Sequence, residues 1–385
     1  MDDLIPPLLR YLDETREDQL DLLRRLVLSE SPSLVPTAQD EVLGILTAEL
    51  EAVGMDVDYT SGDELGGYLV ARDADRAEPG IDGSQLLIGH CDTVWPLGTL
   101  ETMPLQEDGG RMRGPGVYDM KAGLTQIIYA LGALREVGIS PPLAPIVFIN
   151  SDEEIGSRES RPRLYELAQQ VDRALVFEPS LGPTGKIKTA RKGVGRFTLT
   201  AKGKAAHAGL DPDSGASAIF ELSFLIQQLF ALNDPERGVT VNVGMIDGGV
   251  RPNVIAPEST ATVDVRVLHQ DDVPRIEQAI HDLKPSTPGV ELEISGRIGR
   301  PPMEHTERNR TLWKLAQACG DSLGMELDEG TAGGGSDGNH TSLHTATLDG
   351  LGAVGDGAHA AHEYIDVDAT LDRIALVALL IATAS

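Results

Sequence analysis

Five short segments of this chain carry the residue types that catalysis requires. The first, GHCDTVWP at residues 89–96, follows an apolar run and holds His90, Cys91 and Asp92. On a β-strand, His90 and Asp92 share one face and Cys91 points to the other, which leaves a cysteine nucleophile without a base on its own side. A metal-bound imidazole instead needs a carboxylate on its second nitrogen, and Asp92 can supply one. Alone, an H-x-D sequence at a strand end more often only caps a loop.

Three further segments supply carboxylates. GPGVYDMKAG places Asp119 in a glycine-flanked loop before a helical segment, where a single aspartate is more often a helix N-cap. NSDEEIGS offers Glu153 and Glu154 side by side after an apolar run, so both can face one site only if the strand has already ended. The alternative is that the two glutamates lie in a solvated acidic turn without a catalytic role. VFEPS ends another apolar run with Glu178, whose burial would be costly without a cation.

The last segment, GAHAAHEYI, supplies His359 and His362. Two histidines and four carboxylates form a ligand set suited to zinc, cobalt or manganese rather than to copper or an iron–sulfur cluster. Charge counting favours two divalent ions. Three ligating carboxylates and a hydroxide balance two such ions, and the fourth carboxylate remains available as a base.

The elements that must position these residues predict an α/β domain. Apolar runs typical of strands alternate with amphipathic helical segments, which indicates a mixed sheet with helices on both faces. From about residue 190 the pattern changes to period two, in the order strand, helix, strand, strand, helix, strand. This order predicts a ferredoxin-like α+β domain at 190–300, inserted into an α/β domain formed by 1–189 and 301–385.

Composition limits the partners and the compartment. The 60 acidic and 32 basic side chains give a net charge of −28, so we expect neither nucleic acid nor an anionic membrane as a partner. Cys91 and Cys319 provide no disulfide framework, which is typical of a reducing compartment. The N-terminus does not read as a secretory signal, and the apolar C-terminal segment is too short for a bilayer of ~30 Å. We therefore expect a cytoplasmic protein.

The order of the motifs adds a resemblance. GHCDTV, GPGVYDMKAG, NSDEEIGS, VFEPS, AHAG and HAAHEY resemble, in this order, the motifs of the M20 family of co-catalytic metallopeptidases and deacylases, and most of all its glutamate carboxypeptidase branch. Each motif is weak alone, but six in order over nearly the whole chain are specific. The resemblance implies a two-zinc enzyme, with cobalt or manganese as alternatives. It also implies that the inserted domain is a lid and dimerisation domain, so we expect a homodimer.

The resemblance also implies a metal-ligand set. Asp119 bridges the two metals, His90 and Glu178 complete one site, and Glu154 and a C-terminal histidine complete the other. In the family this histidine usually stands four residues before the glutamate of an E-Y pair. That spacing selects His359.

The remaining chemical roles follow from the same resemblance. Glu153 becomes the general base that takes a proton from a metal-bridging water and passes it to the leaving amine. Asp92 orients the imidazole of the first histidine ligand, and His362 lies at the rim of the site. His207, in AHAG, resembles a lid histidine that donates to the oxyanion. Without the family pattern, His207 would be taken for an exposed loop residue.

Substrate contacts are expected in and around the inserted domain. Asn253 and Arg266 match in spacing a pair that grips the substrate's terminal carboxylate in the glutamate carboxypeptidases, and Arg251 is a second candidate. An arginine fork suits a carboxylate, although Arg266 could equally pair with an acidic neighbour on its strand. Gly335 in GGGSDGN could contribute to a backbone nest for the same carboxylate. Lys186 matches a lysine of the glutamate carboxypeptidases.

The sequence thus predicts a metallo-carboxypeptidase or amidohydrolase. It would cleave the amide bond of a C-terminal, acidic amino acid in a small molecule or short peptide with a free carboxylate. The first alternative is an N-acyl-amino-acid deacylase of the acetylornithine deacetylase or succinyl-diaminopimelate desuccinylase type, which shares every metal ligand. A single-metal aminopeptidase is disfavoured by the bridging aspartate. A non-catalytic binding protein is disfavoured because every ligand and the base are present.

Overall fold

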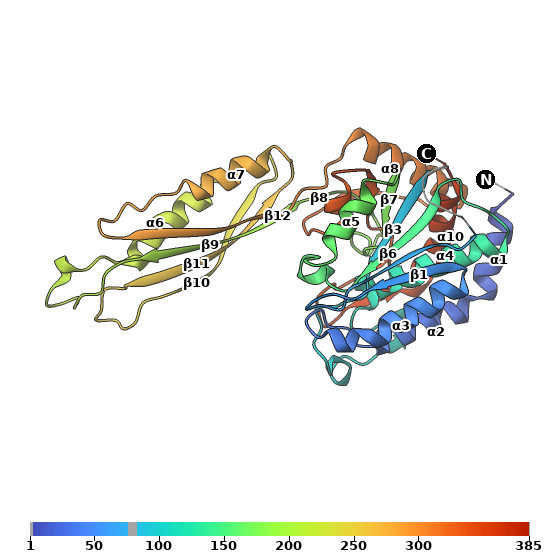
Figure 1. The fold of residues 1–385 in the computed structure, drawn as a ribbon, viewed down its shortest axis with the longest axis horizontal. Helices are drawn as coiled ribbons and strands as arrows, with labels where there is room; N and C mark the ends of the chain where they lie inside the picture. The colour runs from blue at the N-terminus through green and yellow to red at the C-terminus, as the bar shows by residue number, and fades with distance from the viewer. Residues whose placement is uncertain (1–2, 76–82, 385) are drawn as a thin grey trace. The chain divides into compact units, whose positions relative to one another are not determined.

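The chain folds into two compact units, and each is described by itself (Figure 1). The computed structural model describes residues 3–75 and 83–384. Unit 1 comprises Met1–Ala190, His305–Ala332 and Ser336–Ser385, and unit 2 comprises Arg191–Glu304 and Gly333–Gly335. Most of unit 2 is therefore one insertion into unit 1, and the short segment Gly333–Gly335 joins it later in the chain.

Unit 1 is built on a six-stranded mixed sheet with the order β1-β2-β6-β3-β7-β14. Strands β3, β6, β7 and β14 run parallel to their neighbours in this group, whereas β1 and β2 pair antiparallel at one edge. The strands are β1 (Met55–Thr60), β2 (Tyr68–Asp73), β3 (Ser84–His90), β6 (Ala144–Asn150), β7 (Arg173–Val176) and β14 (Ala346–Leu348).

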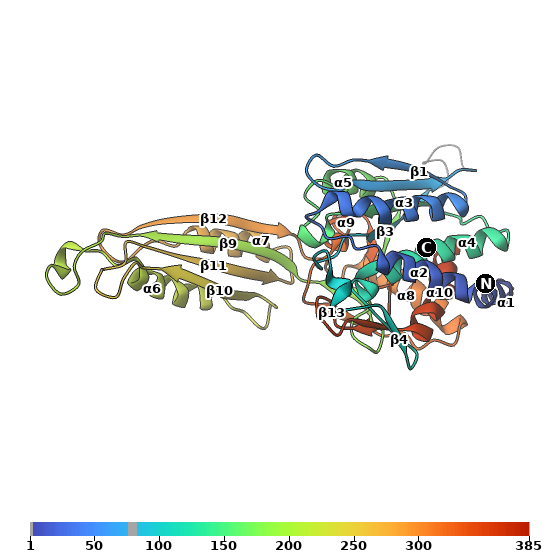
Figure 2. The same ribbon diagram turned by 90° about the horizontal axis from the view of Figure 1, so that it is seen from below.

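Helices cover both faces of this sheet (Figures 1 and 2). They are α1 (Ile5–Glu14), α2 (Arg16–Leu28), α3 (Pro36–Ala52), α4 (Ala122–Glu136), α5 (Arg161–Ala168), α8 (Glu307–Ser322), α9 (Asp337–Thr341) and α10 (Val367–Ala382). The expected α/β fold with helices on both faces is therefore confirmed. Near the N-terminus, the helical residues 5–28 are divided at Thr15 into the two helices α1 and α2.

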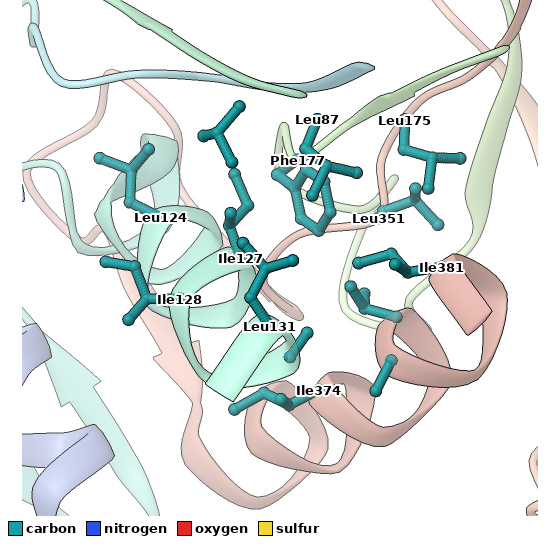
Figure 3. Close-up of a cluster of buried hydrophobic side chains, with 14 of the residues drawn as sticks. Leu87, Leu124, Ile127, Ile128, Leu131, Leu175, Phe177, Leu351, Ile374 and Ile381 are labelled. Atoms are coloured by element: carbon teal, nitrogen blue, oxygen red, sulfur yellow. The ribbon is translucent and has the colours of Figure 1, made fainter. Parts of the chain in front are cut away.

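Alternate residues of the central strands form separate cores on the two faces. Leu87 belongs to the larger core, together with Leu124 of α4 and Ile374 of α10 (Figure 3). Leu86 lies in the opposite core together with Leu164 of α5. Because both faces are covered, β3 is buried along its whole length, as expected for a strand inside a parallel sheet. Each fully buried leucine contributes about 1.5–3 kcal/mol, so these cores fix where the strands end.

Unit 2 has the predicted order of elements. Its strands β9 (Gly193–Lys202), β10 (Thr240–Gly248), β11 (Glu258–Val267) and β12 (Glu291–Arg300) form an antiparallel sheet in the order β10-β11-β9-β12. Helices α6 (Ala218–Phe230) and α7 (Asp272–His281) pack on it around a separate apolar core. This is the ferredoxin-like arrangement.

Smaller elements complete the described part of the chain. β8 (Ile187–Arg191) pairs with β13 (Glu329–Ala332), and a small sheet has the order β15-β16-β5-β4. The latter joins β4 (Gln106–Asp108), β5 (Arg111–Arg113), β15 (Gly355–Asp356) and β16 (Tyr364–Asp366). Within residues 3–75 and 83–384, no helix has the length and apolar character needed to cross a membrane.

Candidate active site

The predicted metal-binding residues of unit 1 come together where three parallel strands end. His90 is the last residue of β3, and it pairs in register with Asn150, the last residue of β6. Glu178 follows the end of β7 by two residues. In α/β sheets, sites form at the carboxyl ends of parallel strands, and here that edge carries the charged side chains.

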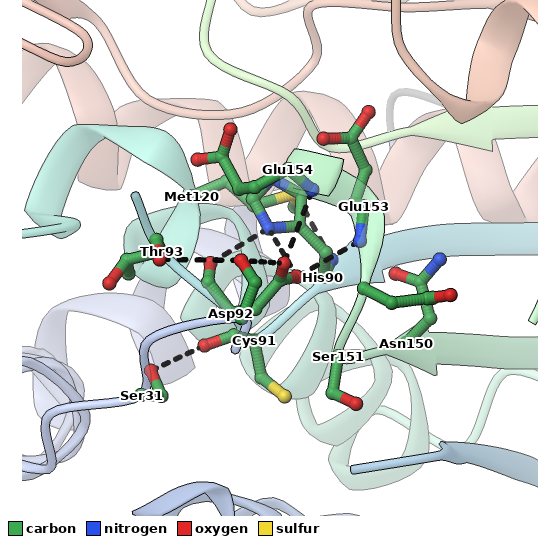
Figure 4. Close-up of polar contacts among 12 residues, drawn as sticks. Ser31, His90, Cys91, Asp92, Thr93, Met120, Asn150, Ser151, Glu153 and Glu154 are labelled. Carbon is green, nitrogen blue, oxygen red and sulfur yellow. Dashed lines mark hydrogen bonds and ion pairs between the residues drawn. The ribbon is translucent and has the colours of Figure 1, made fainter. Parts of the chain in front are cut away.

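His90 is held between carboxylates on both ring nitrogens. Its Nδ1 lies 3.3 Å from Asp92 Oδ1, and its Nε2 lies 3.3 Å from Asp119 Oδ1 and 3.5 Å from Glu178 Oε1. Because β3 ends at His90, Asp92 reaches the imidazole from the loop rather than from the same strand face. Cys91 is buried in the main core, where burial raises the pKa of its thiol, and its side chain points away from the imidazole (Figure 4).

Asp92 also holds the turn that carries the paired glutamates. Its Oδ1 accepts the backbone N–H of Glu153 at 3.2 Å, and its Oδ2 accepts that of Glu154 at 3.2 Å (Figure 4). The Ser33 hydroxyl donates to Oδ2 at 2.7 Å. One buried carboxylate therefore sets the imidazole of His90 and the backbone of both glutamates.

The glutamate pair lies beyond the end of its strand. β6 ends at Asn150, and residues Glu153–Ile155 form a short 3-10 turn that closes on Gly156 with φ 99°. A positive φ of this size strongly favours glycine. Glu154 Oε2 lies 3.1 Å from His359 Nε2. One possible ligand atom each from Glu153, His90 and Glu178 lie within 4.8 Å of one another.

Asp119 lies between the two histidines. It belongs to the irregular turn Val117–Lys121, and its peptide bond to Met120 is cis. Its Oδ1 faces His90, whereas its Oδ2 lies 3.5 Å from His359 Nε2. The two oxygens of one carboxylate thus point to two different histidines, which is the arrangement of a bridging ligand.

The electrostatics of the cluster are those of a cation site. Asp119 and Glu154 raise the pKa of His359 to about 11. Burial raises the pKa of Glu154 to about 7, although His359 opposes this shift. Burial would also raise the pKa of Asp119, but His359 and His90 bring it well below its usual value. Closely packed carboxylates therefore depend on positive charge at this place.

Buried polar atoms without partners give a test of metal binding. Among the residues that the structure describes, His90 Nε2, Asp119 Oδ1 and Glu154 Oε1 are buried and make no hydrogen bond. Buried polar groups that make no hydrogen bond are rare in proteins, and a bound ion or water commonly accounts for them. The donors are imidazole nitrogens and carboxylate oxygens, which suit zinc, cobalt and manganese. The residues present therefore fit a metal centre.

Comparison with known proteins establishes the family. The model for "Peptidase family M20/M25/M40" matches residues 86–383. The chain belongs to this family. It is 30% identical over 346 residues to carboxypeptidase G2 of Pseudomonas sp. (strain RS-16), covering 87% of this chain and 82% of that protein. It is 28% identical over 277 residues to acetylornithine deacetylase of Myxococcus xanthus, covering 68% and 70%.

A solved structure shows the same fold. An M20 family metallo-carboxypeptidase from Sulfolobus solfataricus matches with a TM-score of 0.76 at 15% identity, covering 94% of this chain and 98% of that one. Membership makes the chain a hydrolase of the metallopeptidase and amidohydrolase class, as the sequence predicted. Five of the six M20-type motifs build the cluster in unit 1, whereas AHAG lies in unit 2.

Two other predicted residues of unit 1 lie outside the cluster contacts. Both His359 and His362 are exposed, but it is His359 whose imidazole faces Asp119 and Glu154. Lys186 forms an ion pair with Asp328, with 2.6 Å between Nζ and Oδ2. The structure thus gives Lys186 an acidic partner of its own.

Apart from Lys186, the predicted substrate residues of the M20 chain lie in unit 2. His207 is exposed, and its Nδ1 accepts the N–H groups of Gly209 and Leu210, each at 3.2 Å. A neutral His207 therefore carries its proton on Nε2, which can donate. Asn253 lies beside this loop, since its carbonyl oxygen accepts the N–H of Ala208 at 3.0 Å.

Arg266, which was expected to bind the substrate carboxylate, already pairs with the carboxylate of a neighbouring residue. Arg266 donates from Nε and from its terminal nitrogen to the two oxygens of Asp264, at 2.8 and 2.9 Å. This is the neighbour pairing that the sequence left open. Arg251 is exposed, and Gly335 belongs to the short glycine segment that clusters with unit 2.

Sequence reasoning assigned no role to three residues around the cluster. Ser33 contacts Asp92 from a segment 59 residues earlier. Glu363 and Trp95 form a second buried contact beside Asp119. Burial raises the pKa of the Glu363 carboxyl to about 7, while N–H bonds oppose the shift. The only available signals were the tryptophan in the first motif and the E-Y pair after the last histidine.

Proposed function

We propose that this M20 chain is a two-zinc exopeptidase that cleaves the amide bond of a C-terminal, acidic amino acid. The observation that carries the proposal is Asp119, whose two oxygens face two histidines, His90 buried and His359 half-exposed, in a cluster where three buried nitrogen and oxygen atoms make no hydrogen bond. His90 and Glu178 would hold one metal together with Asp119, and Glu154 and His359 would hold the other.

The chain's own residues divide the chemistry between them. When bound, two divalent ions would supply Lewis acidity and would lower the pKa of a water molecule bound to them. The Glu153 carboxylate takes the proton of the attacking water and delivers it to the leaving amine. Glu153 suits this role because it is nearly buried beside the ligand atoms of His90 and Glu178. The Asp92 carboxylate accepts the backbone N–H of Glu153 and so keeps Glu153 in place.

The substrate preference rests on likeness and on unit 2. Similarity to carboxypeptidase G2 favours a carboxypeptidase. We assign recognition of the substrate carboxylate to Arg266 and Asn253, with Gly335 and Lys186 as further contacts, and donation to the oxyanion to His207. Because Arg266 is paired with Asp264, a substrate carboxylate must share or displace that partner. This exchange favours strongly anionic substrates.

A deacylase is the second candidate. The observation that favours it is the similarity to acetylornithine deacetylase over about two thirds of each chain. Both reactions hydrolyse an amide next to an amino acid and use the same metal ligands. Only the substrate pocket would differ.

We further propose that unit 2 is a lid and that it joins two copies into a homodimer. The outer surface of α6 exposes Phe220 (57%), Phe224 and Phe230, and β10, an edge strand, exposes Met245 (70%) and Ile246. Exposed apolar side chains beside an open sheet edge are typical of an association surface. A monomer in size-exclusion chromatography with light scattering would contradict this assignment. The two free cysteines favour a cytoplasmic location, which cell fractionation would test.

The function is tested with a substrate panel. Dipeptides and N-acyl amino acids are assayed before chelation, after chelation and after zinc is restored. Zinc-dependent release of C-terminal glutamate or aspartate is expected. Turnover confined to acetyl- or succinyl-amino acids would instead support the deacylase. Activity that survives complete chelation would contradict both.

A further inference from the structure

The Glu363 carboxylate is buried and receives four N–H groups. Its Oε1 accepts the backbone N–H of Tyr118 at 2.9 Å and that of Asp119 at 3.1 Å. Its Oε2 accepts the backbone N–H of Gly116 at 3.0 Å and the indole N–H of Trp95 at 2.8 Å. The side chain of Glu363 has no exposed surface. Both oxygens are therefore committed to the loop that carries Asp119.

None of these four groups can reverse its role. A backbone amide nitrogen and an indole nitrogen donate and never accept. A carboxylate satisfies all four, because it offers only acceptors. A glutamine of the same shape would place its NH₂ either against Tyr118 and Asp119 or against Gly116 and Trp95. In both orientations hydrogen atoms oppose each other in a buried place, which is costly.

Glu363 also stands in the turn that carries the other histidine. Its backbone N–H donates to the Ala360 carbonyl at 2.9 Å, and His359 directly precedes Ala360. One residue thus joins the loop of Asp119 to the turn of His359. These two ligands face each other across 3.5 Å.

We propose that Glu363 is a positioning residue for metal binding, which fixes Asp119 relative to His359 through its acceptor-only carboxylate. The proposal rests on the two-metal function above. It assigns Trp95 of the first motif a role as one of the four donors. Glu363 touches no reacting atom, so its effect must appear in metal affinity before it appears in chemistry.

The experiment compares Glu363→Gln with a matched control, Glu221→Gln. Glu221 is also fully buried, and it accepts the backbone N–H groups of Ser286 and Thr287 in unit 2 at 2.9 and 2.6 Å. Glu221 suits this comparison because none of these hydrogen-bond partners is a proposed metal ligand. Zinc affinity is measured by competition with a chromogenic chelator, and thermal unfolding is measured on metal-free protein. Both variants are expected to unfold at a lower temperature than the wild type.

Only Glu363→Gln is expected to weaken zinc binding, by about 10–100-fold, the usual effect of removing a residue that orients ligands. Zinc affinity within twofold of wild type in folded Glu363→Gln would overturn the proposal. An equal loss of zinc affinity in Glu221→Gln would also overturn the proposal, because it would show that the loss comes from general destabilisation of the protein. A wild-type chain that binds fewer than two zinc ions would instead overturn the proposed function, on which the inference rests.

Removing one donor gives an independent test. Trp95→Phe leaves three N–H groups on the carboxylate, so it should fold and bind zinc more weakly by a smaller factor. In the double variant Trp95→Phe/Glu363→Gln, the glutamine NH₂ faces one opposing donor instead of two, so part of the affinity should return. Additive losses in the double variant would contradict the donor argument. If Glu363→Gln does not fold, the zinc affinity of Trp95→Phe becomes the test. A Trp95→Phe protein that binds zinc as tightly as the wild type would overturn the proposal.

Discussion

Replacing Asp92 by asparagine tests how the metal cluster is held. The Asp92 carboxylate has no exposed surface. Its Oδ1 lies 3.3 Å from His90 Nδ1 and 3.2 Å from the N–H of Glu153, and its Oδ2 accepts from Glu154 and Ser33. An asparagine NH₂ faces a backbone N–H in either orientation. Neither backbone N–H can become an acceptor, although the Ser33 hydroxyl can accept as well as donate.

The size of the effect follows from these contacts. A hydrogen bond to a charged group contributes about 1.5–3 kcal/mol, and a buried donor without an acceptor costs about 1–3 kcal/mol. We expect Asp92→Asn to lower the free energy of unfolding of the metal-free protein by about 2–4 kcal/mol on this basis. We also expect zinc affinity to fall by about 10–100-fold, because the imidazole of His90 loses its orienting charge.

Urea unfolding and chelator competition measure the two quantities. Ser33→Ala is the matched control, since it removes one donor from the same carboxylate and leaves the charge; it should cost about 1 kcal/mol. An Asp92→Asn protein with wild-type stability and zinc affinity would refute the reasoning. An effect no larger than that of Ser33→Ala would show that the backbone N–H groups of the glutamate turn do not depend on Asp92.

Three further predictions concern residues outside the ligand set. Leu87→Ala should lower the free energy of unfolding by about 2–5 kcal/mol, measured by urea unfolding, because it opens a cavity in the larger core; a loss under 1 kcal/mol would contradict the packing. Cys91→Ala should keep turnover, and iodoacetamide should not label Cys91 in the native protein, because the thiol is buried and its pKa is raised; rapid labelling would argue against this. Burial raises the pKa of Asp272, but Arg237 and Arg275 outweigh it and lower the pKa below its usual 3.8. This depressed pKa stabilises the fold above pH 3.8 and loses its effect as pH falls through the folded-state value. Asp272→Asn should therefore destabilise at pH 7 and progressively less in acid, as seen by thermal unfolding across pH; a cost independent of pH would contradict the ion pairs.

The sequence was most informative where one strand and its end could be read together. Apolar runs such as that before His90 predicted buried strands, and polar residues directly after them predicted one edge of the sheet. The structure adds that β3 stops at His90, so Asp92 acts from a loop rather than from the strand face. The glycine-rich segment at 333–339 was considered as a backbone nest for a carboxylate, and the structure shows that α9 begins within it. Ser336 caps this short helix, a local signal that the glycines obscured.

Long-range contacts to backbone groups were beyond sequence reasoning. Ser33 and Glu363 reach Asp92 and Asp119 across 59 and 244 residues. The carboxylates of Asp92 and Glu363 accept mainly from backbone N–H groups, which every residue except proline possesses, so no residue pattern predicts these contacts. Residue type was also ambiguous for Arg266. Its spacing suited a substrate carboxylate, whereas the structure pairs it with Asp264.

The central claim is that Glu154 binds metal while Glu153 moves the proton. Bound zinc per chain and turnover, measured side by side for Glu153→Gln and Glu154→Gln, test it most directly. We expect Glu153→Gln to keep two zinc ions and to lose about 10²–10⁴-fold in turnover, whereas Glu154→Gln should lose one zinc ion. Two zinc ions in Glu154→Gln together with one in Glu153→Gln would show that the two roles are assigned the wrong way round.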